Sequence, residues 1–534
     1  MTHLKEELRE PVADRPAPPV VRNARITLAA VCLSTFMLLL DLTIVATALA
    51  ELQSTFTATL DSLQWVVDAY TLPIAGMVLI AATLGDRIGR KRLYLVGVVV
   101  FTTASVACAM APSILALNMA RGVQGVGAAL LFGISLPIIA ATFVEPRSRA
   151  RAIAVYGAVL ASAAAAGPLI GGIVVDTMGW EAIFLINVPL GILAFLAAWR
   201  YMAESRDLRP RRADWVGTAT ISIALFAGVF ALIEGNNAGW TSATIITAVI
   251  TSLVALVVFV GWELRTPEPM LDLRLIAQPT FAALTLGGLA IGGTIFAGVN
   301  YLALYYMNTL EFSPLQAGLC ALPLTLAAFF VSPVVAILQR HMPIRWSLPG
   351  AVVLIAVGLF LCTGVSVGTH WTHFVLGSII GGIGLGAASV IVSQGALAFV
   401  SVERSGMASG TVLTARQVGT ALGIAGLGAL FADRATASTE RSLTGLGPFV
   451  RGIPPHEVDR LTDALGSGVG RRVVDYLPDQ MSGFAPAVDR IAVQASASGM
   501  DAIMWAGAIT AGVLAVAIFV LCRLPGAREI DLDR

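Results

Sequence analysis

Four charged residues stand inside long apolar stretches of the chain: Asp41, Asp68, Arg121 and Arg416. An ionisable side chain inside a membrane costs about 2.5 to 3.5 kcal/mol, so by default it faces a partner, a water-filled cavity or a proton path. A carboxylate that takes up and releases a proton there can exchange that proton for a cation, because binding of either excludes the other. The alternative is a buried ion pair that only holds helices together.

The depths of these residues predict which of them meet. Asp41 and Arg121 each lie about eight residues from the same end of their predicted helices, or about 12 Å deep at 1.5 Å per residue. Asp68 lies about five residues in from that end. We expect these three side chains in one cluster, Asp68 as the proton-binding carboxylate and Arg416 nearer the midplane.

The elements that position these residues must cross a membrane. Of the 534 residues, 57% are hydrophobic and 13% are charged, and the mean hydropathy is +0.83, whereas soluble domains carry roughly 25% charge. A bilayer core about 30 Å thick requires roughly 20 apolar residues per helix, and such runs recur about fourteen times along the chain. The sequence therefore predicts an all-α integral membrane protein.

Basic residues in alternate loops predict the orientation. Arg and Lys occur in the loops after the even-numbered predicted helices, from Arg87 to Arg404, and are absent from the short loops between them. Because positive loops stay in the cytoplasm, we expect both termini there and the long segment 432–501 outside, as a solvated linker. The Arg- and Ala-rich composition indicates a bacterial source. We therefore expect a multi-pass protein of the bacterial cell (inner) membrane.

A faint internal repeat divides the chain. Gly125 and Gly127 match Gly382 and Gly384 in the two halves, which indicates two six-helix bundles of common design. Two further helices have no counterpart and look inserted between the bundles. The expected organisation is a cytoplasmic tail 1–25, a first bundle 26–200, a linker with the inserted pair 201–274, a second bundle 275–523 containing the outer segment 432–501, and a cytoplasmic tail 524–534.

Several functional classes are disfavoured. A net charge of +1 leaves no basic surplus for nucleic acid. The five cysteines are far apart in apolar runs, which argues against a disulfide framework or a metal site. The sequence holds no GxxxxGK[ST] phosphate loop, so ATP is not the expected energy source. We expect a protein that is not an enzyme, that needs no cofactor or metal, and that works as a monomer.

Several motifs together resemble the major facilitator superfamily, in particular its fourteen-helix drug:proton antiporter branch of the QacA and EmrB type. Gly85-Asp86-Arg87-Ile88-Gly89-Arg90 resembles the superfamily's loop between helices 2 and 3. The segment around Arg121 is similar to its helix 4 motif, and Gly167-Pro168 with Gly171-Gly172 is similar to the helix 5 motif of antiporters. Leu40-Asp41-Leu42-Thr43 resembles the helix 1 motif of this branch.

The resemblance implies roles for these residues. It assigns gating to the loop and helix 5 motifs, with Asp86 capping a helix of the other half. It ties Arg121 to proton coupling, and an acid at the position of Asp68 is typical of exporters of cationic compounds. The implied gating residues are Gly85, Asp86, Arg87, Gly89, Arg90, Gly167, Pro168, Gly171 and Gly172.

The expected function is proton-coupled efflux of lipophilic, cationic antimicrobials or dyes by alternating access between the two halves. The partners are then small lipophilic molecules, protons and the bilayer. Aromatic side chains could stack on a flat cation or only pack between helices; the candidates are Trp65, Tyr70, Phe296, Tyr301 and Tyr305. The alternative function is a dedicated exporter of one endogenous metabolite or antibiotic, which gives self-resistance.

Overall fold

The structure is a computed structural model. It describes residues 23–206, 213–267, 269, 271, 273–339, 342–398, 405–445, 462, 465, 468, 470–476 and 485–524. Within these residues, thirteen helices are long and apolar enough to cross a membrane. Helix α6 (Pro146–Met178) takes the place of the remaining predicted span and contains a shorter apolar stretch, Ala166–Met178. The predicted multi-pass, all-helical membrane architecture is confirmed, whereas most of both predicted tails lies outside the described residues.

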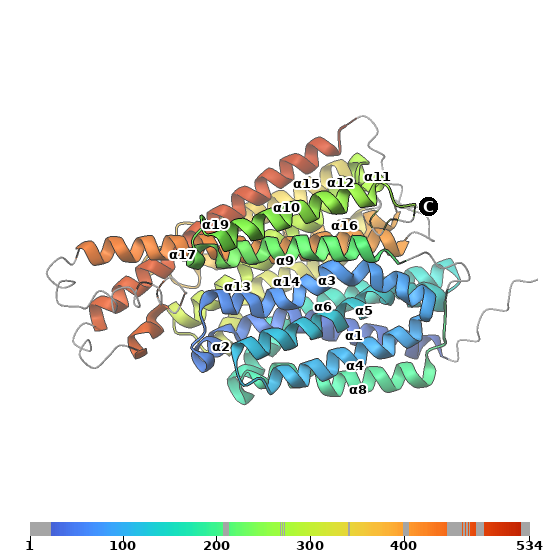
Figure 1. Cartoon of the computed structure of the whole chain (residues 1–534), viewed down its shortest axis with the longest axis horizontal. Helices are drawn as coiled ribbons and strands as arrows, with labels where there is room; N and C mark the ends of the chain where they lie inside the picture. Colours follow the sequence, from blue (N-terminus) through green and yellow to red (C-terminus); the bar gives the residue numbers. More distant parts are fainter. Residues whose placement is uncertain are drawn as a thin grey trace, which may run out of the picture.

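The first half of the chain forms one side of an elongated bundle (Figure 1). Its elements are α1 (Ala24–Ile44), the 3-10 turn η1 (Val45–Thr47), α2 (Leu49–Phe56), α3 (Leu60–Ile88), α4 (Arg90–Ala109), α5 (Ile114–Thr142), α6, α7 (Glu181–Leu185) and α8 (Asn187–Tyr201). The inserted pair follows as α9 (Trp215–Ala238) and α10 (Ala243–Glu263).

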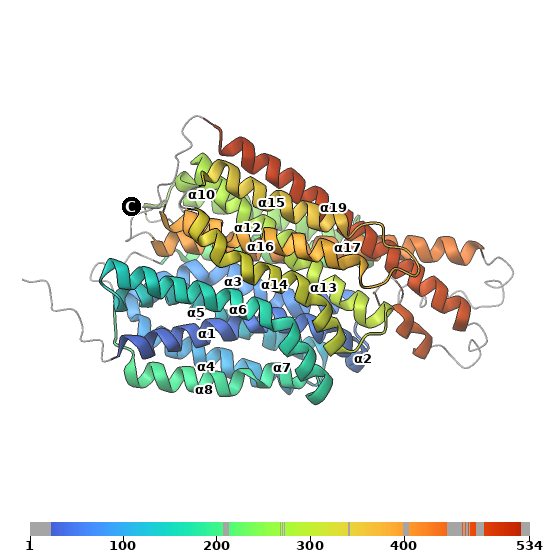
Figure 2. The same ribbon diagram turned by 180° about the vertical axis from the view of Figure 1, so that it is seen from behind.

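The second half forms the other side of the bundle in both views (Figures 1 and 2). Its elements are α11 (Leu273–Ile276), α12 (Pro279–Ala290), η2 (Ile291–Phe296), α13 (Ala297–Leu304), η3 (Tyr305–Thr309), α14 (Pro314–Leu338), α15 (Ile344–Leu361), α16 (His373–Ala398), α17 (Ser405–Gly445), η7 (Gly470–Tyr476) and α19 (Ala485–Leu521). We call the side where α1 begins and α19 ends the terminal side, and the opposite side the distal side.

Side-chain caps fix where several membrane helices begin. The Thr59 hydroxyl accepts a hydrogen bond from the backbone amide of Ser62 at the start of α3. The Ser113 hydroxyl accepts one from the backbone amide of Ala116 at the start of α5. Before α14, Ser313 and Gln316 form a reciprocal capping box. These caps satisfy amide groups that the first helical turn leaves without partners.

The described parts of the segment 432–501 are more helical than the sequence suggests. Helices α17 and α19 run well beyond the predicted spans, to Gly445 and from Ala485. Together with η7 they enclose a small apolar core of Leu443, Leu465, Val473, Val488, Ile491 and Ala492. The expectation of a solvated linker is wrong for these described parts, because apolar residues at helical spacing let the two helices pack on each other.

The first membrane helix of the second half contains two wide turns. Residues Ile291–Phe296 and Tyr305–Thr309 are π-helical, which interrupts the regular hydrogen-bond ladder twice within one span. At the first wide turn the backbones of Gly292 and Gly293 lie against α17, where added Cβ atoms would meet the carbonyl oxygens of Arg416 and Gly419. Such turns inside α-helices are frequent at functional sites.

Candidate functional site

A polar cluster lies in the core of the first half. Asp41 of α1 forms an ion pair with Arg121 of α5, and both side chains are fully buried. The carboxylate oxygen Oδ1 also accepts hydrogen bonds from Gln124 Nε2 at 2.9 Å and from Asn187 Nδ2 at 2.8 Å. Ser105 Oγ joins the cluster 2.8 Å from Gln124 Nε2. Residues of α1, α4, α5 and α8 thus meet at one buried carboxylate.

Arg121 is held on several sides. Its Nε donates to the Val66 carbonyl of α3 at 2.9 Å, and one Nη donates to Gln124 Oε1 at 2.7 Å. The guanidinium lies 4.3 Å from the centre of the Tyr70 ring, a cation–π contact. A buried ion pair is tolerated only with such additional partners, because desolvation of both charges is costly.

Asp68 lies apart from this pair. Thr71 Oγ1 donates to Asp68 Oδ1 at 3.3 Å, and among the described residues Oδ2 has no hydrogen-bond partner. The expected three-residue cluster does not form, because residues two apart on a helix point to nearly opposite sides. Tyr70 faces Arg121, so Asp68 points away from it.

The face of α3 that carries Asp68 packs against α17. One turn before Asp68, Gln64 lies against Gly428, and one turn after it Leu72 packs with Ala421 and Ala425. Since positions four apart share a helix face, the Asp68 carboxylate lies at the junction of the two halves. Gln64 Oε1 is buried there without a hydrogen-bond partner in the described part of the chain.

Arg416 lies on α17, half-buried. Its guanidinium is 4.5 Å from the centre of the Phe296 ring, and its Nε has no hydrogen-bond partner among the described residues. Arg416 lies about 14 Å along α17 from the level of Ala425, from the helical rise of 1.5 Å per residue. Arg416 and Asp68 therefore belong to different levels of the molecule.

The glycines of the α6 motif mark close contacts. Gly167 and Gly171 lie against Thr43 and Thr47, at the end of the first membrane helix. Gly172 lies against the backbone of Pro314 in α14, and Gly318 of α14 lies against the Pro168 carbonyl. Any larger residue would push these helices apart. The motif thus joins α6 both to α1 and to the other half on the distal side.

The loop motif lies on the terminal side within the first half. Asp86 pairs with Arg90, one turn away, through Nη2 at 2.7 Å and Nε at 2.9 Å. Gly89 has φ +112°, a conformation that favours glycine, and Gly85 packs against Ile134. Arg87 is exposed. The cap of a helix of the other half by Asp86 stays a prediction, because residues 399–404, directly before α17, lie outside the described residues. The ion pair that Asp86 forms with Arg90 is made within the first half.

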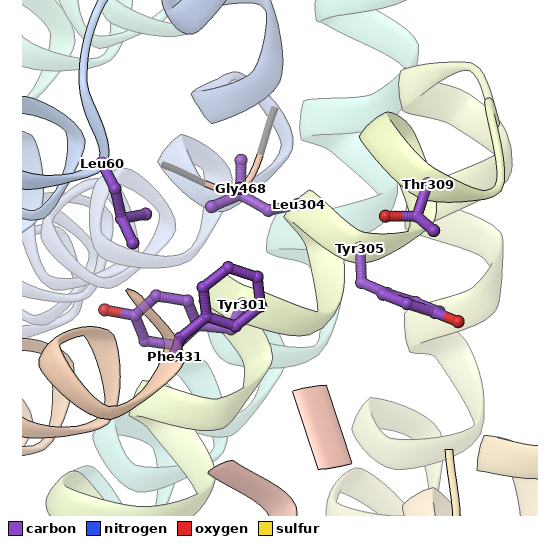
Figure 3. Close-up of a pocket in the computed structure, with 7 residues that line it drawn as sticks. All are labelled: Leu60, Tyr301, Leu304, Tyr305, Thr309, Phe431 and Gly468. Carbon is purple, nitrogen blue, oxygen red and sulfur yellow. The ribbon is translucent and has the colours of Figure 1, made fainter. Parts of the chain in front are cut away.

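Figure 3 shows how the distal end is closed. Tyr301 stacks on Phe431 with ring centres 6.2 Å apart, and Leu60 of the first half faces them. These residues line a space of about 10 Å³ with Leu304, Tyr305, Thr309 and Gly468. A space of that size holds at most one water molecule. These seven residues, which we call the distal seal, therefore leave no space for a drug-sized molecule between them.

The aromatic candidates do not converge on one site. Trp65 packs against Phe226 of α9 with ring centres 5.3 Å apart. Tyr70 lies under Arg121, and Phe296 lies under Arg416. Tyr301 and Tyr305 belong to the distal seal. Each ring thus has a neighbour that accounts for its position.

Sequence reasoning did not single out Ser105, Asn187 and Gln64 as site residues. All three are buried polar side chains at the two sites just described. The available signal was their polarity within apolar helices, since a buried polar group requires a partner. For Gln64 there was a second signal, its position one helical turn from Asp68.

The helical halves and the inserted pair define a membrane transporter fold, and comparison with known proteins identifies the family. The pattern of the Major Facilitator Superfamily matches residues 31–424, and the chain belongs to that family. Multidrug resistance protein Stp of Mycobacterium tuberculosis is 36% identical over 427 residues, which cover 79% of this chain and 78% of Stp. A methylenomycin A resistance protein of Streptomyces coelicolor is also 36% identical, over 404 residues, which cover 73% of this chain and 82% of that protein.

Solved structures share the fold. A bacterial homologue of the human lysosomal transporter Spinster, described as inward-facing and unoccupied, superposes with a TM-score of 0.61 at 19% identity. The match covers 94% of this chain and 97% of that one. The relatives and the fold together confirm the predicted family.

Proposed function

We propose that this chain is a proton-coupled exporter of lipophilic, cationic antimicrobials or dyes that works as a monomer without a cofactor. Membership of a transporter family and relatives named for drug resistance support export. The observation that carries the coupling is Asp68. Its carboxylate is fully buried at the junction of α3 and α17, with one oxygen lacking a hydrogen-bond partner among the described residues.

The proposed cycle uses Asp68 for both cargo and proton. We take the terminal side to be cytoplasmic, because its loops carry the basic residues. A cation arriving from that side displaces the proton from Asp68. When the distal seal opens, α3 and α17 separate, a proton from outside binds Asp68, and the cation leaves. The buried Asp41–Arg121 pair fixes the helices around this site, and Arg416 of α17 places a positive charge nearer the terminal side.

The charge balance sets the driving force. Exchange of one proton for one monovalent cation moves no net charge, so the membrane potential does not contribute. Each unit of pH difference then supplies about 1.4 kcal/mol. A second proton per cycle would add about 2.3 kcal/mol for every 100 mV.

A dedicated exporter of one antibiotic is the second candidate. It is favoured by relatives such as the methylenomycin A resistance protein and the tetracenomycin C resistance and export protein of Streptomyces glaucescens. A panel of unrelated drugs, tested in a pump-deficient host, separates the two functions. Resistance to a single compound class, together with neighbouring biosynthetic genes, would favour the dedicated exporter.

The test of the coupling role is Asp68→Asn. In inverted membrane vesicles energised by a proton gradient, we expect this variant to lose ethidium transport while the wild-type chain retains it. The matched control is Asp433→Asn, because Asp433 is a carboxylate of α17 with 67% of its side chain exposed. Size-exclusion chromatography checks that both variants are folded.

Two results would contradict the proposal. Unchanged ethidium transport by the Asp68→Asn variant would remove Asp68 from the mechanism. Wild-type transport that a protonophore does not affect would remove proton coupling altogether.

A further inference from the structure

An open space of about 490 Å³ lies at the terminal ends of α15 and α19, away from the Asp68 junction. The two helices pack against each other, and Figure 2 shows them side by side along one edge of the molecule. They are antiparallel, because α15 begins on the terminal side and α19 ends there. The space has the size of a small-molecule site, about 300–1,000 Å³. Its lining residues are Arg345, Trp346, Cys522, Arg523 and Leu524.

This space is basic. Arg345 and Arg523 are both exposed there, and none of the described residues that line the space is acidic. The first turn of α15 contains Arg345, without an acidic residue and without a side-chain cap. The positive end of the helix dipole therefore adds to the charge of the arginine, which is unfavourable. A bound anion would offset both charges.

Two aromatic rings hold Arg523 in place. Its guanidinium lies 4.1 Å from the centre of the Phe519 ring and 4.7 Å from the centre of the Trp346 ring. Within the described part of the chain, its side chain makes no hydrogen bond or ion pair. The rings thus position the guanidinium while its five N–H donors stay available. Phosphate is a preferred acceptor for such donors, because arginine can bind two of its oxygens at once.

An apolar strip runs from this space along both helices toward the distal side. An aromatic pair bounds it at each end. Trp346 and Phe519 have ring centres 5.6 Å apart, and Phe360 and Trp505 have ring centres 5.3 Å apart. The two pairs are fourteen residues apart on each helix, or about 21 Å. This length exceeds half the thickness of a hydrocarbon core of about 30 Å, so the strip spans one leaflet.

Glycines open the middle of the strip. A Cβ added at Gly350 of α15 or at Gly512 of α19 would meet no atom within 4 Å. Val353 and Val516 beside them are 46% and 64% exposed. An acyl chain can therefore approach the backbone between the aromatic pairs, because glycine has no side chain to hold it away.

We propose that this site binds one anionic phospholipid. The phosphate lies between Arg345 and Arg523, the headgroup lies beside Trp346, and one acyl chain lies on the strip. Basic pockets between membrane helices bind anionic headgroups, and tryptophan is enriched at the level of the headgroups. The lipid links the start of α15 to the end of α19 and so stabilises the second half of the chain. The site is separate from Asp68, so this inference does not depend on proton coupling.

The first test measures lipid binding by native mass spectrometry of the full chain in detergent, titrated with dioleoylphosphatidylglycerol. We expect Arg523→Gln to weaken binding of the first lipid molecule at least fivefold. Adding Arg345→Gln should weaken it to the level of dioleoylphosphatidylcholine. The matched control is Arg200→Gln, which should change binding less than twofold. Arg200 is also exposed, lies in the last turn of α8 on the terminal side, and has its guanidinium 5.3 Å from the centre of the Tyr201 ring.

The second test fills the strip. Gly350→Trp should weaken binding of dioleoylphosphatidylglycerol at least threefold. Gly261→Trp on α10 should change it less than twofold, because Gly261 is likewise open to an added Cβ but lies on another helix. At a lipid concentration of about ten times Kd, the wild-type melting temperature should rise by about 3–6 °C, and that of the Gly350→Trp chain by less than half as much. Gly350→Leu replaces Gly350→Trp if that variant aggregates. Unchanged lipid binding would overturn the placement of the acyl chain.

Three results would overturn the lipid site itself. The first is equal binding of dioleoylphosphatidylglycerol by the wild-type and Arg523→Gln chains. The second is an equal rise in melting temperature with millimolar inorganic phosphate, which would make the space a site for free anions. The third is a chain that binds the lipid only after Glu529, Asp531 and Asp533 are neutralised, which would assign the space to the acidic end of the chain.

Discussion

Asp41→Asn is the sharpest test of the buried cluster. The substitution keeps the shape of the side chain and removes its charge, so the buried guanidinium of Arg121 loses its counter-ion. The Asp41 carboxylate accepts hydrogen bonds from Arg121, Gln124 and Asn187. The NH₂ group of the new amide can only donate, so it faces another donor in either orientation. Breaking a buried pair on one side costs about 3–5 kcal/mol. At about 2–4 °C per kcal/mol for a unit of 150–250 residues, we expect the melting temperature to fall by roughly 6–20 °C.

The assay is thermal unfolding of the purified protein in detergent, run as a double-mutant cycle with Arg121→Gln. Removing both charges leaves no uncompensated ion, so the double variant should lose at least about 2 kcal/mol less than the sum of the single losses. The matched control cycle uses the exposed pair Asp433 and Arg434, 3.9 Å apart, where we expect coupling below about 0.5 kcal/mol. Additive losses at Asp41 and Arg121 would refute the reasoning.

Three further outcomes are expected. Gly172→Val should block closure of the distal seal, because its Cβ would meet the backbone of α14, and vesicle transport should be lost. Gly157→Ala should transport normally, because a Cβ there would meet no atom within 4 Å. Asn308→Ala removes two hydrogen bonds, to Gln53 Oε1 at 2.8 Å and to the Gly468 carbonyl at 2.9 Å. At about 1 kcal/mol for each bond, the melting temperature should fall by a few degrees. An unchanged melting temperature would contradict a stabilising role of these two bonds. Phe296→Leu removes the cation–π contact of Arg416, which is worth about 0.5–2 kcal/mol, and should lower the melting temperature. The control is Phe360→Leu, at an exposed phenylalanine, which should lower the melting temperature less.

The apolar runs predicted the membrane helices because the bilayer imposes a length that a sequence displays directly. The contact of Asp41 with Arg121 followed from their equal depths. Depth carries no information about direction around the helix axis, which is why Asp68 was placed in the same cluster. The contact of Tyr70 with Arg121 shows that Asp68 points to the other side of α3.

The distal ends of α17 and α19 could not be predicted from apolar length. The segment lacks a run of 20 apolar residues, and its helices are stabilised by packing between Leu443, Val488 and Ile491, residues that are far apart in sequence. The packing of α9 against both α3 and α17 was equally hidden, because hydropathy shows that a helix crosses the membrane and does not show its neighbours.

The wide turns η2 and η3 bear on how the distal seal can open. Each turn leaves the backbone with fewer regular bonds to break, so the helix can bend at that point at lower cost than elsewhere. The stretch between them, Ala297–Leu304, carries Tyr301 of the seal, while Arg416 lies beside the first turn and Asn308 within the second. This span therefore consists of two α-helical rods, α12 and α13, joined by the wide turn η2, with η3 at its distal end. A bend at η2 would move α13 and its tyrosine aside while α12 keeps its contacts.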